Sequence, residues 1–276
     1  MILRDGKIPE EFVLPSPDFR TQCMRIQPPK SVYTHITATD LVCSTRGKWY
    51  AMEDSLSVPD GIAYPHFARK LCREIAPENY QVPELCDNCG LDILLRQLYR
   101  DIMDDDPELE GGIVVLLSQG KQDLSYFELC YMAKLTGAVV AEAEQLIVMD
   151  NKVYYQAPEG GFQRVAIIHR LALDSMLDPL CFDEDSPCGV PHLMEAYCAG
   201  HIAIINAPGC SLAEDRGLHY FIPTMIRYYL DEEPILPNVP TFVPWYPDQK
   251  KYVLEHMDSL IFKDVSSDRR AGAVYG

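Results

Sequence analysis

One stretch of the sequence constrains the fold more than any other, because apolar runs alternate with helical patterns from residue 112 to about residue 208. The run GIVVLLS at 112–118 has the length and the continuous apolar character of a strand buried on both faces. A helical pattern at 124–137 ends at Gly137, and RVAIIHR and HIAIINAPG predict further buried strands. Buried strands that alternate with helices predict a parallel α/β layer over these residues.

A second pattern lies nearer the N-terminus, in DLVCSTRGKWYAMEDS at residues 40–55. Two short apolar runs flank a polar turn at Arg46 and Gly47, which predicts a β-hairpin with Asp40 and Glu53 at matching ends. Side chains two residues apart on a strand share a face, so Glu53 and Ser55 can point at one ion while Asp40 approaches from the partner strand. From the residues alone, a pair of solvated carboxylates at strand ends is the more common arrangement.

Composition and charge narrow the function classes. The chain has 276 residues, 47% of them hydrophobic and 24% charged, as in ordinary globular proteins. Its net charge of −17, with no basic patch, argues against nucleic acid as a partner. The acidic stretch at 101–112 predicts a solvated linker between two packed units. The sequence contains no apolar run of membrane-spanning length and no signal-peptide pattern at its start, so we expect a cytoplasmic protein with no membrane partner.

Several blocks, taken in order along almost the whole chain, resemble the circularly permuted ATP-grasp family, the group described as glutathionylspermidine-synthase-like. These blocks are ILRDGKIPEEFVLPSPDF, THITATDLV, KWYAMEDSLSVPDGIAY, LDPLCFDEDSPCGVPHLMEAY, AIINAPG, IPTMIRYYLDEEPILPNVPT and MDSLIFKDV. The resemblance implies an α/β fold in which a parallel, pre-ATP-grasp-like layer is combined with the antiparallel sheet portion of an incomplete permuted ATP-grasp domain. It also implies three parts: 1–110 with the metal-binding hairpin, 111–210 as a substrate-binding-like α/β domain, and 211–276 as a helical segment and the start of a lid.

The activity implied by the resemblance is ATP-dependent carboxylate–amine ligation through an acyl phosphate, with Mg²⁺ as the metal. A carboxylate is a poor electrophile until one oxygen leaves as phosphate, and hard oxygen ligands are needed to hold the Mg²⁺. The resemblance assigns Asp40, Glu53 and Ser55 to the metal. It assigns Lys263, at the end of SLIFK, to the nucleotide phosphates.

The same resemblance extends to the lid and to the substrate cleft. Gly272 and Gly276, in the loop after Lys263, are the predicted backbone contacts to the nucleotide. Arg170 and Asn206 follow predicted parallel strands, where ligands bind in open α/β sheets, so they are candidates for substrate binding, with Arg170 also the candidate catalytic residue. For Arg170, a structural ion pair is an equally good interpretation, and Asn206 could simply form a turn.

The sequence also departs from the family pattern at several positions. Ser55 stands where the third metal ligand is usually asparagine, and Ser57 stands where an arginine is common. An Asp-Lys pair is represented by Asp215 and Arg216, and the lid loop SSDRRAGAVYG is poorer in glycine than usual. The resembled proteins continue past this loop and before ILRDG.

Three interpretations therefore stay open: a fragment of a longer ligase, half of a split ligase completed by a second polypeptide, or a relative that only binds. In each of them we expect the chain alone not to turn over ATP. The expected partners are small-molecule or peptide acids and amines. A dinucleotide-binding oxidoreductase is disfavoured, because the loop after IVVLLS has no GxGxxG motif.

Overall fold

The computed structural model describes residues 1–80, 90–104, 106–265 and 272–276. By its internal contacts the chain divides into two compact units, each built from more than one stretch of sequence. Unit 1 comprises Met1–Met24, Thr37–Ser57 and Gly209–Gly276, and unit 2 comprises Arg25–Ile36 and Val58–Pro208. The division at residues 110 and 210 follows family motifs rather than contacts, and it stays a prediction.

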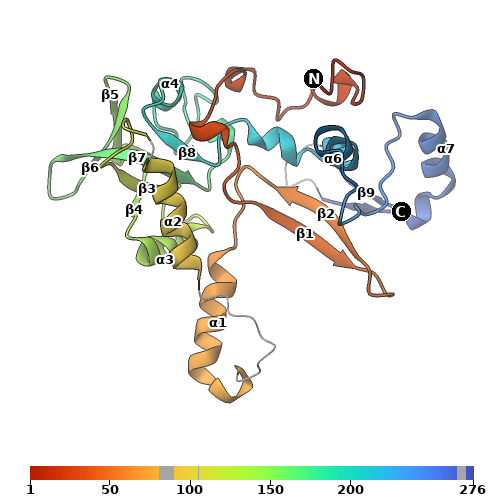
Figure 1. Cartoon of the computed structure of the whole chain (residues 1–276), viewed down its shortest axis with the longest axis horizontal. Coiled ribbons are helices and arrows are strands. Elements are labelled where there is room, and N and C mark those ends of the chain that lie inside the picture. Colours follow the sequence, from red (N-terminus) through yellow and green to blue (C-terminus); the bar gives the residue numbers. More distant parts are fainter. Residues whose placement is uncertain (81–89, 105, 266–271) are drawn as a thin grey trace. The chain divides into compact units, whose positions relative to one another are not determined.

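Unit 2 contains the parallel layer that the sequence predicts (Figure 1). Strand β3 (Ile113–Leu117) pairs in parallel with β4 (Val139–Ala141) and with β7 (Phe162–Arg170), and β8 (Ala203–Ile205) pairs in parallel with β7. The predicted α/β class, with a mostly parallel sheet and an antiparallel hairpin sheet, is confirmed.

An antiparallel extension joins the same sheet. Strands β5 (Leu146–Met149) and β6 (Lys152–Gln156) form a hairpin, and β6 pairs with the first residues of β7. The turn lies at Asp150 and Asn151, which both have positive φ angles, 51° and 57°. Aspartate and asparagine tolerate this left-handed backbone better than most residues, so both are suited to this turn.

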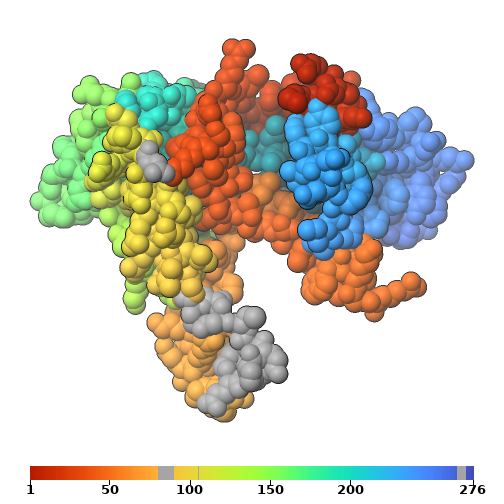
Figure 2. Space-filling model, viewed as in Figure 1, coloured from red at the N-terminus to blue at the C-terminus, as the bar shows by residue number. Residues whose placement is uncertain are grey.

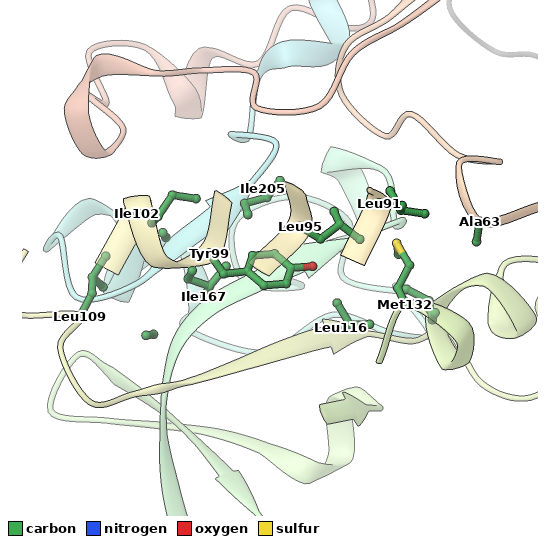
Figure 3. Packing of buried hydrophobic residues seen from close by; sticks show 13 residues of the cluster. Ala63, Leu91, Leu95, Tyr99, Ile102, Leu109, Leu116, Met132, Ile167 and Ile205 are labelled. Carbon is green, nitrogen blue, oxygen red and sulfur yellow. The ribbon is translucent and has the colours of Figure 1, made fainter. Parts of the chain in front are cut away.

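The α-helices of unit 2 in the described residues are α1 (Ala63–Ile75), α2 (Leu91–Met103), α3 (Tyr126–Thr136) and α4 (Leu193–Cys198). Helices α2 and α3 bury apolar side chains against the sheet, and α1 contacts α3. Figure 3 shows Leu95 and Tyr99 of α2 and Met132 of α3 around Leu116 of β3, in a cluster of buried apolar side chains. Helix α3 ends at Gly137, whose φ of 83° is readily adopted only without a Cβ atom.

The acidic stretch at 101–112 differs from its prediction as a linker between packed units. Residues 101–103 are the last of α2, and Leu109, only 1% exposed, belongs to the core of unit 2. Gly112 lies so close to β7 that an added Cβ would come within 2.7 Å of the Ala166 Cβ. The described acidic residues of this stretch therefore lie in a turn whose flanking residues both pack within unit 2.

Unit 1 is built around the predicted hairpin of β1 (Ala38–Cys43) and β2 (Trp49–Ser55). Its helices are α5 (Arg216–His219), α6 (Ile222–Leu230) and α7 (Pro247–Glu255), and the short strands β9 (Ile261–Phe262) and β10 (Val274–Tyr275) pair antiparallel. The proline-rich segment after α6 adds to the hairpin edge, because Ala51 N donates to Pro237 O at 2.9 Å and Val239 N donates to Ala51 O at 2.8 Å.

The N-terminal residues complete the core of unit 1. Ile2, Ile8 and Val13 are buried together with Leu218 and Phe221 of the segment from α5 to α6. The packing of these N-terminal residues fixes α5 beside the hairpin within unit 1, where the candidate site lies.

Short 3₁₀ helices connect the longer elements along the described parts of the chain: Glu10–Phe12, Thr21–Cys23, Pro29–Ser31, Pro77–Tyr80, Ala143–Gln145, Asp174–Met176, Cys210–Glu214 and Met257–Ser259.

Candidate functional site

The β1–β2 hairpin brings the three predicted metal ligands to one face. Asp40 and Glu53 are direct cross-strand partners, and Met52 bulges out of register beside them. Side chains directly opposite each other project from the same face, with Cβ atoms about 5 Å apart. Ser55 is two residues beyond Glu53 and shares that face. Whether these side chains hold a metal stays a prediction.

Two cations approach the Glu53 carboxylate. Lys263 Nζ donates a hydrogen bond to Glu53 Oε1. Arg216 Nε lies 3.4 Å from Glu53 Oε1, and its Nη2 donates to Oε2 at 3.5 Å. Burial by itself would raise the pKa of Glu53, but the hydrogen bonds and charges of Lys263 and Arg216 outweigh it, so this pKa lies below its ordinary value. The carboxylate is thus held ionised between two cations.

Helix α5 owes its position to the capping residue Asp215. The Asp215 Oδ1 atom accepts hydrogen bonds from the backbone N–H groups of Gly217, at 2.8 Å, and of Leu218, at 3.2 Å. Its Oδ2 atom accepts from the Ser16 hydroxyl at 2.8 Å, and Asp215 is only 2% exposed. The cap fixes the first turn of α5 and therefore the place from which Arg216 extends.

Arg216 also joins α5 to the chain that follows β9. Its backbone N–H donates to Val265 O at 3.0 Å, and its Nη1 donates to Asp264 O at 3.2 Å. Lys263 directly precedes these two acceptors. One arginine therefore contacts both the hairpin acid and the segment that carries the candidate phosphate-binding lysine.

The residue after Glu53 binds the other end of α5. Asp54 Oδ2 lies 3.2 Å from His219 Nδ1, and Asp54 Oδ1 accepts from the Thr39 hydroxyl at 2.6 Å. The nearby His219 is the largest cause that lowers the pKa of Asp54; the Thr39 hydroxyl adds to it, and burial opposes it. Consecutive acids of β2 thus hold Arg216 and His219, the first and last residues of α5.

Position 57, where the resembled proteins commonly carry arginine, is buried here. Ser57 is 0% exposed, and its backbone N–H donates to Glu214 Oε1 at 2.7 Å. Leu56 N donates to the same oxygen at 2.6 Å. Glu214 therefore caps the end of β2, and no cation is presented from position 57.

Arg170 lies in the interior of unit 2 at the end of β7, with a side chain that is 0% exposed. Its Nη2 donates to Asp174 Oδ1 at 2.6 Å, and its other nitrogens donate to the carbonyl oxygens of Ala172 and Asn206. These contacts are those of a structural ion-pair partner, the alternative that the sequence left open. A role in substrate binding or catalysis stays a prediction that these contacts do not support.

Asn206 likewise binds its own chain. Its Oδ1 accepts from the backbone N–H groups of His35, at 2.8 Å, and Ile36, at 3.1 Å, and its Nδ2 donates to Ile36 O at 2.6 Å. The side chain thus holds residues 35–36 against the carboxyl end of β8. Its contact with a substrate is also only a prediction.

The two glycines predicted to touch the nucleotide lie on either side of β10. Gly272 lies two residues before this strand, and the Gly276 N–H donates to Leu260 O at 3.2 Å, next to β9. Most of the predicted lid loop, residues 266–271, lies outside the described residues. The nucleotide contacts of both glycines remain predictions.

The donor set of the hairpin fits Mg²⁺ by its chemistry, because two carboxylates and a hydroxyl are hard oxygen ligands. In the part of the chain that the structure describes, three or more acidic, histidine or cysteine side chains nowhere gather in a way that could hold a metal. Mg²⁺ commonly uses only one or two protein carboxylates and takes its other ligands from phosphate and water. Asp40 and Glu53 could hold it in that manner.

Sequence reasoning missed three members of this cluster as site residues. The sequence marks Arg216 only as a substitution in an Asp-Lys pair, although a cation directly after a helix-capping residue is a usable signal. Asp54 directly follows Glu53 and projects from the opposite face of the strand, so the pattern of acids that share one face does not include Asp54. His219 has no sequence signal of its own, because only the fold brings it to Asp54.

Comparisons with known proteins agree with this architecture. A family model described as circularly permuted ATP-grasp type 2 matches residues 1–276. The chain belongs to the circularly permuted ATP-grasp family. An uncharacterized protein of Synechocystis sp. is 36% identical over the whole chain, which covers 56% of that relative. An uncharacterized protein of Mycobacterium tuberculosis is 33% identical, again over the whole chain and over 49% of the relative.

A third relative of this ATP-grasp chain carries a functional name. A Frankia casuarinae protein named "putative glutamate–cysteine ligase 2-2" is 31% identical over 99% of the chain and 31% of its own length. The chain thus spans about half the length, or less, of these curated relatives. Among the described residues, no helix is long and apolar enough to cross a membrane. The expectation of a second polypeptide that completes the lid gains no support from the comparisons.

Proposed function

We propose that the protein binds Mg·ATP at the hairpin cluster and takes part in carboxylate–amine ligation through an acyl phosphate. The observation that carries this proposal is the meeting of Lys263 and Arg216 at Glu53, from positions 210 and 163 residues away in the sequence. The fold of unit 1 thus gathers two cations beside a pair of acids, which is the combination that phosphoryl transfer requires. Family membership and the name of the Frankia casuarinae relative point the same way.

The chemistry has two balanced steps. In the first, the γ-phosphoryl group of ATP moves to a carboxylate oxygen, which gives ADP and an acyl phosphate. In the second, an amine nitrogen attacks the acyl carbon, the bond to the phosphate oxygen breaks, and phosphate and a proton leave. When bound, Mg²⁺ neutralises and aligns the phosphate oxygens. Lys263 offers the phosphates a compact point charge, and Arg216 offers a planar fork of donors.

The contacts of Glu53 imply an exchange when the nucleotide binds. Both cations are engaged with Glu53. As they turn to phosphate oxygens, the Glu53 carboxylate becomes available to the metal with Asp40 across the hairpin. Lys263 and Arg216 would thus exchange their ion pairs with Glu53 for contacts with phosphate. The binding of phosphate and the binding of metal should therefore reinforce each other.

Calorimetry with Mg·ATP tests this function. We expect the wild-type chain to bind, and we expect Lys263→Ala and Asp40→Ala each to weaken binding at least tenfold. Lys251→Ala is the matched control, because Lys251 is an exposed lysine of α7 whose Nζ lies 4.0 Å from Glu255 Oε1. Absence of binding to the wild type, or equal binding by all variants, would show that the hairpin cluster is not a nucleotide site.

A non-catalytic binding module is the second candidate, and the burial of Ser57 favours it. The cation that resembled enzymes commonly carry at this position is replaced by a hydroxyl inside the protein. The two functions separate when ADP formation is measured with Mg·ATP, an acid related to glutathione, and an amine. Binding without ADP formation supports the module, and steady ADP formation supports the ligase.

A further inference from the structure

The segment from Tyr220 through the proline-rich chain after α6 forms a pocket that none of the roles above uses. Its volume is about 310 Å³, and residues between 220 and 241 line it. Part of this stretch is the block IPTMIRYYLDEEPILPNVPT, one of those that identify the family. In Figure 2 the sky-blue atoms of α6 and of the segment after it are exposed on the face in view. The volume lies at the small end of the range for ligand pockets.

From the charges of this pocket we infer that it binds the zwitterionic end of a free α-amino acid. Arg227 on α6 and Glu233 just beyond it are the charged residues of the lining. Arg227 Nη2 donates to Glu233 Oε2 at 2.8 Å, and its Nε lies 3.0 Å from both carboxylate oxygens. The pocket is therefore neutral overall while it carries two opposite charges side by side.

This charge pattern selects among ligand classes. A polyanion would be repelled by Glu233, and a polyamine would be repelled by Arg227. An α-amino acid places its carboxylate and its ammonium one carbon apart, so its two charges match a pair of side chains that are in contact. Its carboxylate pairs with Arg227, in the manner of bidentate arginine–carboxylate recognition, and its ammonium pairs with Glu233.

The existing ion pair is poorly suited to a purely structural role. The side chains of Arg227 and Glu233 are 53% and 78% exposed, and ion pairs this exposed contribute little to folding. Replacing the Arg227–Glu233 ion pair with contacts to a ligand therefore costs little folding free energy. The pocket walls are stiffer, because Pro223, Pro234 and Pro237 restrict the backbone around it.

A further polar group lies in the lining. The Tyr220 hydroxyl accepts a hydrogen bond from Gln249 Nε2 at 2.8 Å, and its own proton can be donated to a ligand carboxylate. This hydroxyl and the Arg227 guanidinium give a carboxylate two kinds of donor. The lining thus combines a few polar groups with rigid apolar walls, as small-molecule sites usually do.

The pocket lies beside the proposed nucleotide cluster within unit 1. Pro237 and Val239 of its lining pair with Ala51 of β2, and Ala51 lies two residues before Glu53 on the same strand. This step rests on the proposed function: because the pocket lies near the nucleotide cluster, the amino acid is one of the two ligase substrates. Because its α-groups are held by Arg227 and Glu233, the reacting group belongs to its side chain.

Ligand-observed NMR and calorimetry with four probes test the inference on the intact chain. The probes are L-alanine, 6-aminohexanoate with its charges far apart, propionate and propylamine. We expect L-alanine to bind at least tenfold more tightly than each of the other three. Equal binding of L-alanine and propionate, or no binding of L-alanine, would refute an α-amino-acid site.

Variants locate the binding and show whether it depends on the nucleotide site. Arg227→Gln and Glu233→Gln should each weaken L-alanine at least tenfold at an unchanged melting temperature, while Lys251→Gln, which removes another exposed cation, should leave it unchanged. Unaltered binding in Arg227→Gln overturns the assignment. If the wild type binds Mg·ATP but not L-alanine, the pocket inference fails alone; if it binds L-alanine but not Mg·ATP, the proposed nucleotide function fails alone.

Discussion

The buried His169 should make the stability of the protein depend on pH in a defined direction. His169 lies on β7, is 4% exposed, and its Nδ1 is 2.8 Å from the Tyr99 hydroxyl. Burial, with smaller contributions from the charges of Arg170 and His35, lowers the pKa of His169 from 6.5 to about 4. The folded protein therefore holds a neutral imidazole at pH values where the unfolded chain already binds a proton.

The sign and the size of the effect follow from this difference. Because the pKa is lower in the folded state, the stabilisation is complete above pH 6.5 and is lost as the pH falls to about 4. At about 1.4 kcal/mol per pH unit, this interval corresponds to about 3 kcal/mol of unfolding free energy. Such a loss is a large share of the stability of an ordinary domain.

Urea unfolding of the wild type and of His169→Gln at pH 7 and pH 4 measures this contribution. We expect the wild type to lose about 3 kcal/mol more than the variant over that interval, because glutamine does not titrate. His192→Gln is the control of opposite sign: the hydrogen bond to Glu195 raises the pKa of this exposed histidine, so its removal should not reduce the acid loss. Parallel losses in the wild type and His169→Gln would refute the argument.

Three further outcomes are expected. Arg170→Ala should destabilise the protein by about 3–5 kcal/mol in denaturant unfolding, because it leaves the Asp174 carboxylate buried without its partner; an unchanged midpoint would speak against the structural role. Arg216→Gln should weaken the binding of Mg·ATP but strengthen the binding of Mn²⁺ in the absence of nucleotide, because it frees Glu53 of one competing cation. Paramagnetic relaxation measures the bound Mn²⁺, and changes of the same sign in the two affinities would contradict the proposed exchange of ion pairs. Gly112→Ala should cost about 1–3 kcal/mol by calorimetric melting, because its new methyl group would overlap the backbone of β7, and an equally stable variant would show that the strand can yield.

Local sequence patterns are enough to predict several elements of this fold. The continuous apolar runs of β3 and β7 and the helix stop at Gly137 follow from periodicity and from backbone preference, so the parallel layer was predictable. The hairpin was also predictable from alternation and the polar turn, but the direct pairing of Asp40 with Glu53 depends on a register shift at Met52 that these signals do not encode. The sequence blocks that resemble the family also predict the class of fold.

The partners of Asp40 and Glu53 depend instead on how distant segments pack together. Glu53 and its two cations lie 163 and 210 residues apart in the sequence, and no local preference encodes such a contact. Arg170 pairs with Asp174 only four residues further along the chain, but its hydrogen bond to the Asn206 carbonyl, 36 residues away, also depends on how β7 pairs with β8. Side-chain partners at this range depend on how whole elements pack, since burial of apolar surface sets that packing and the charged groups must then pair where it leaves them.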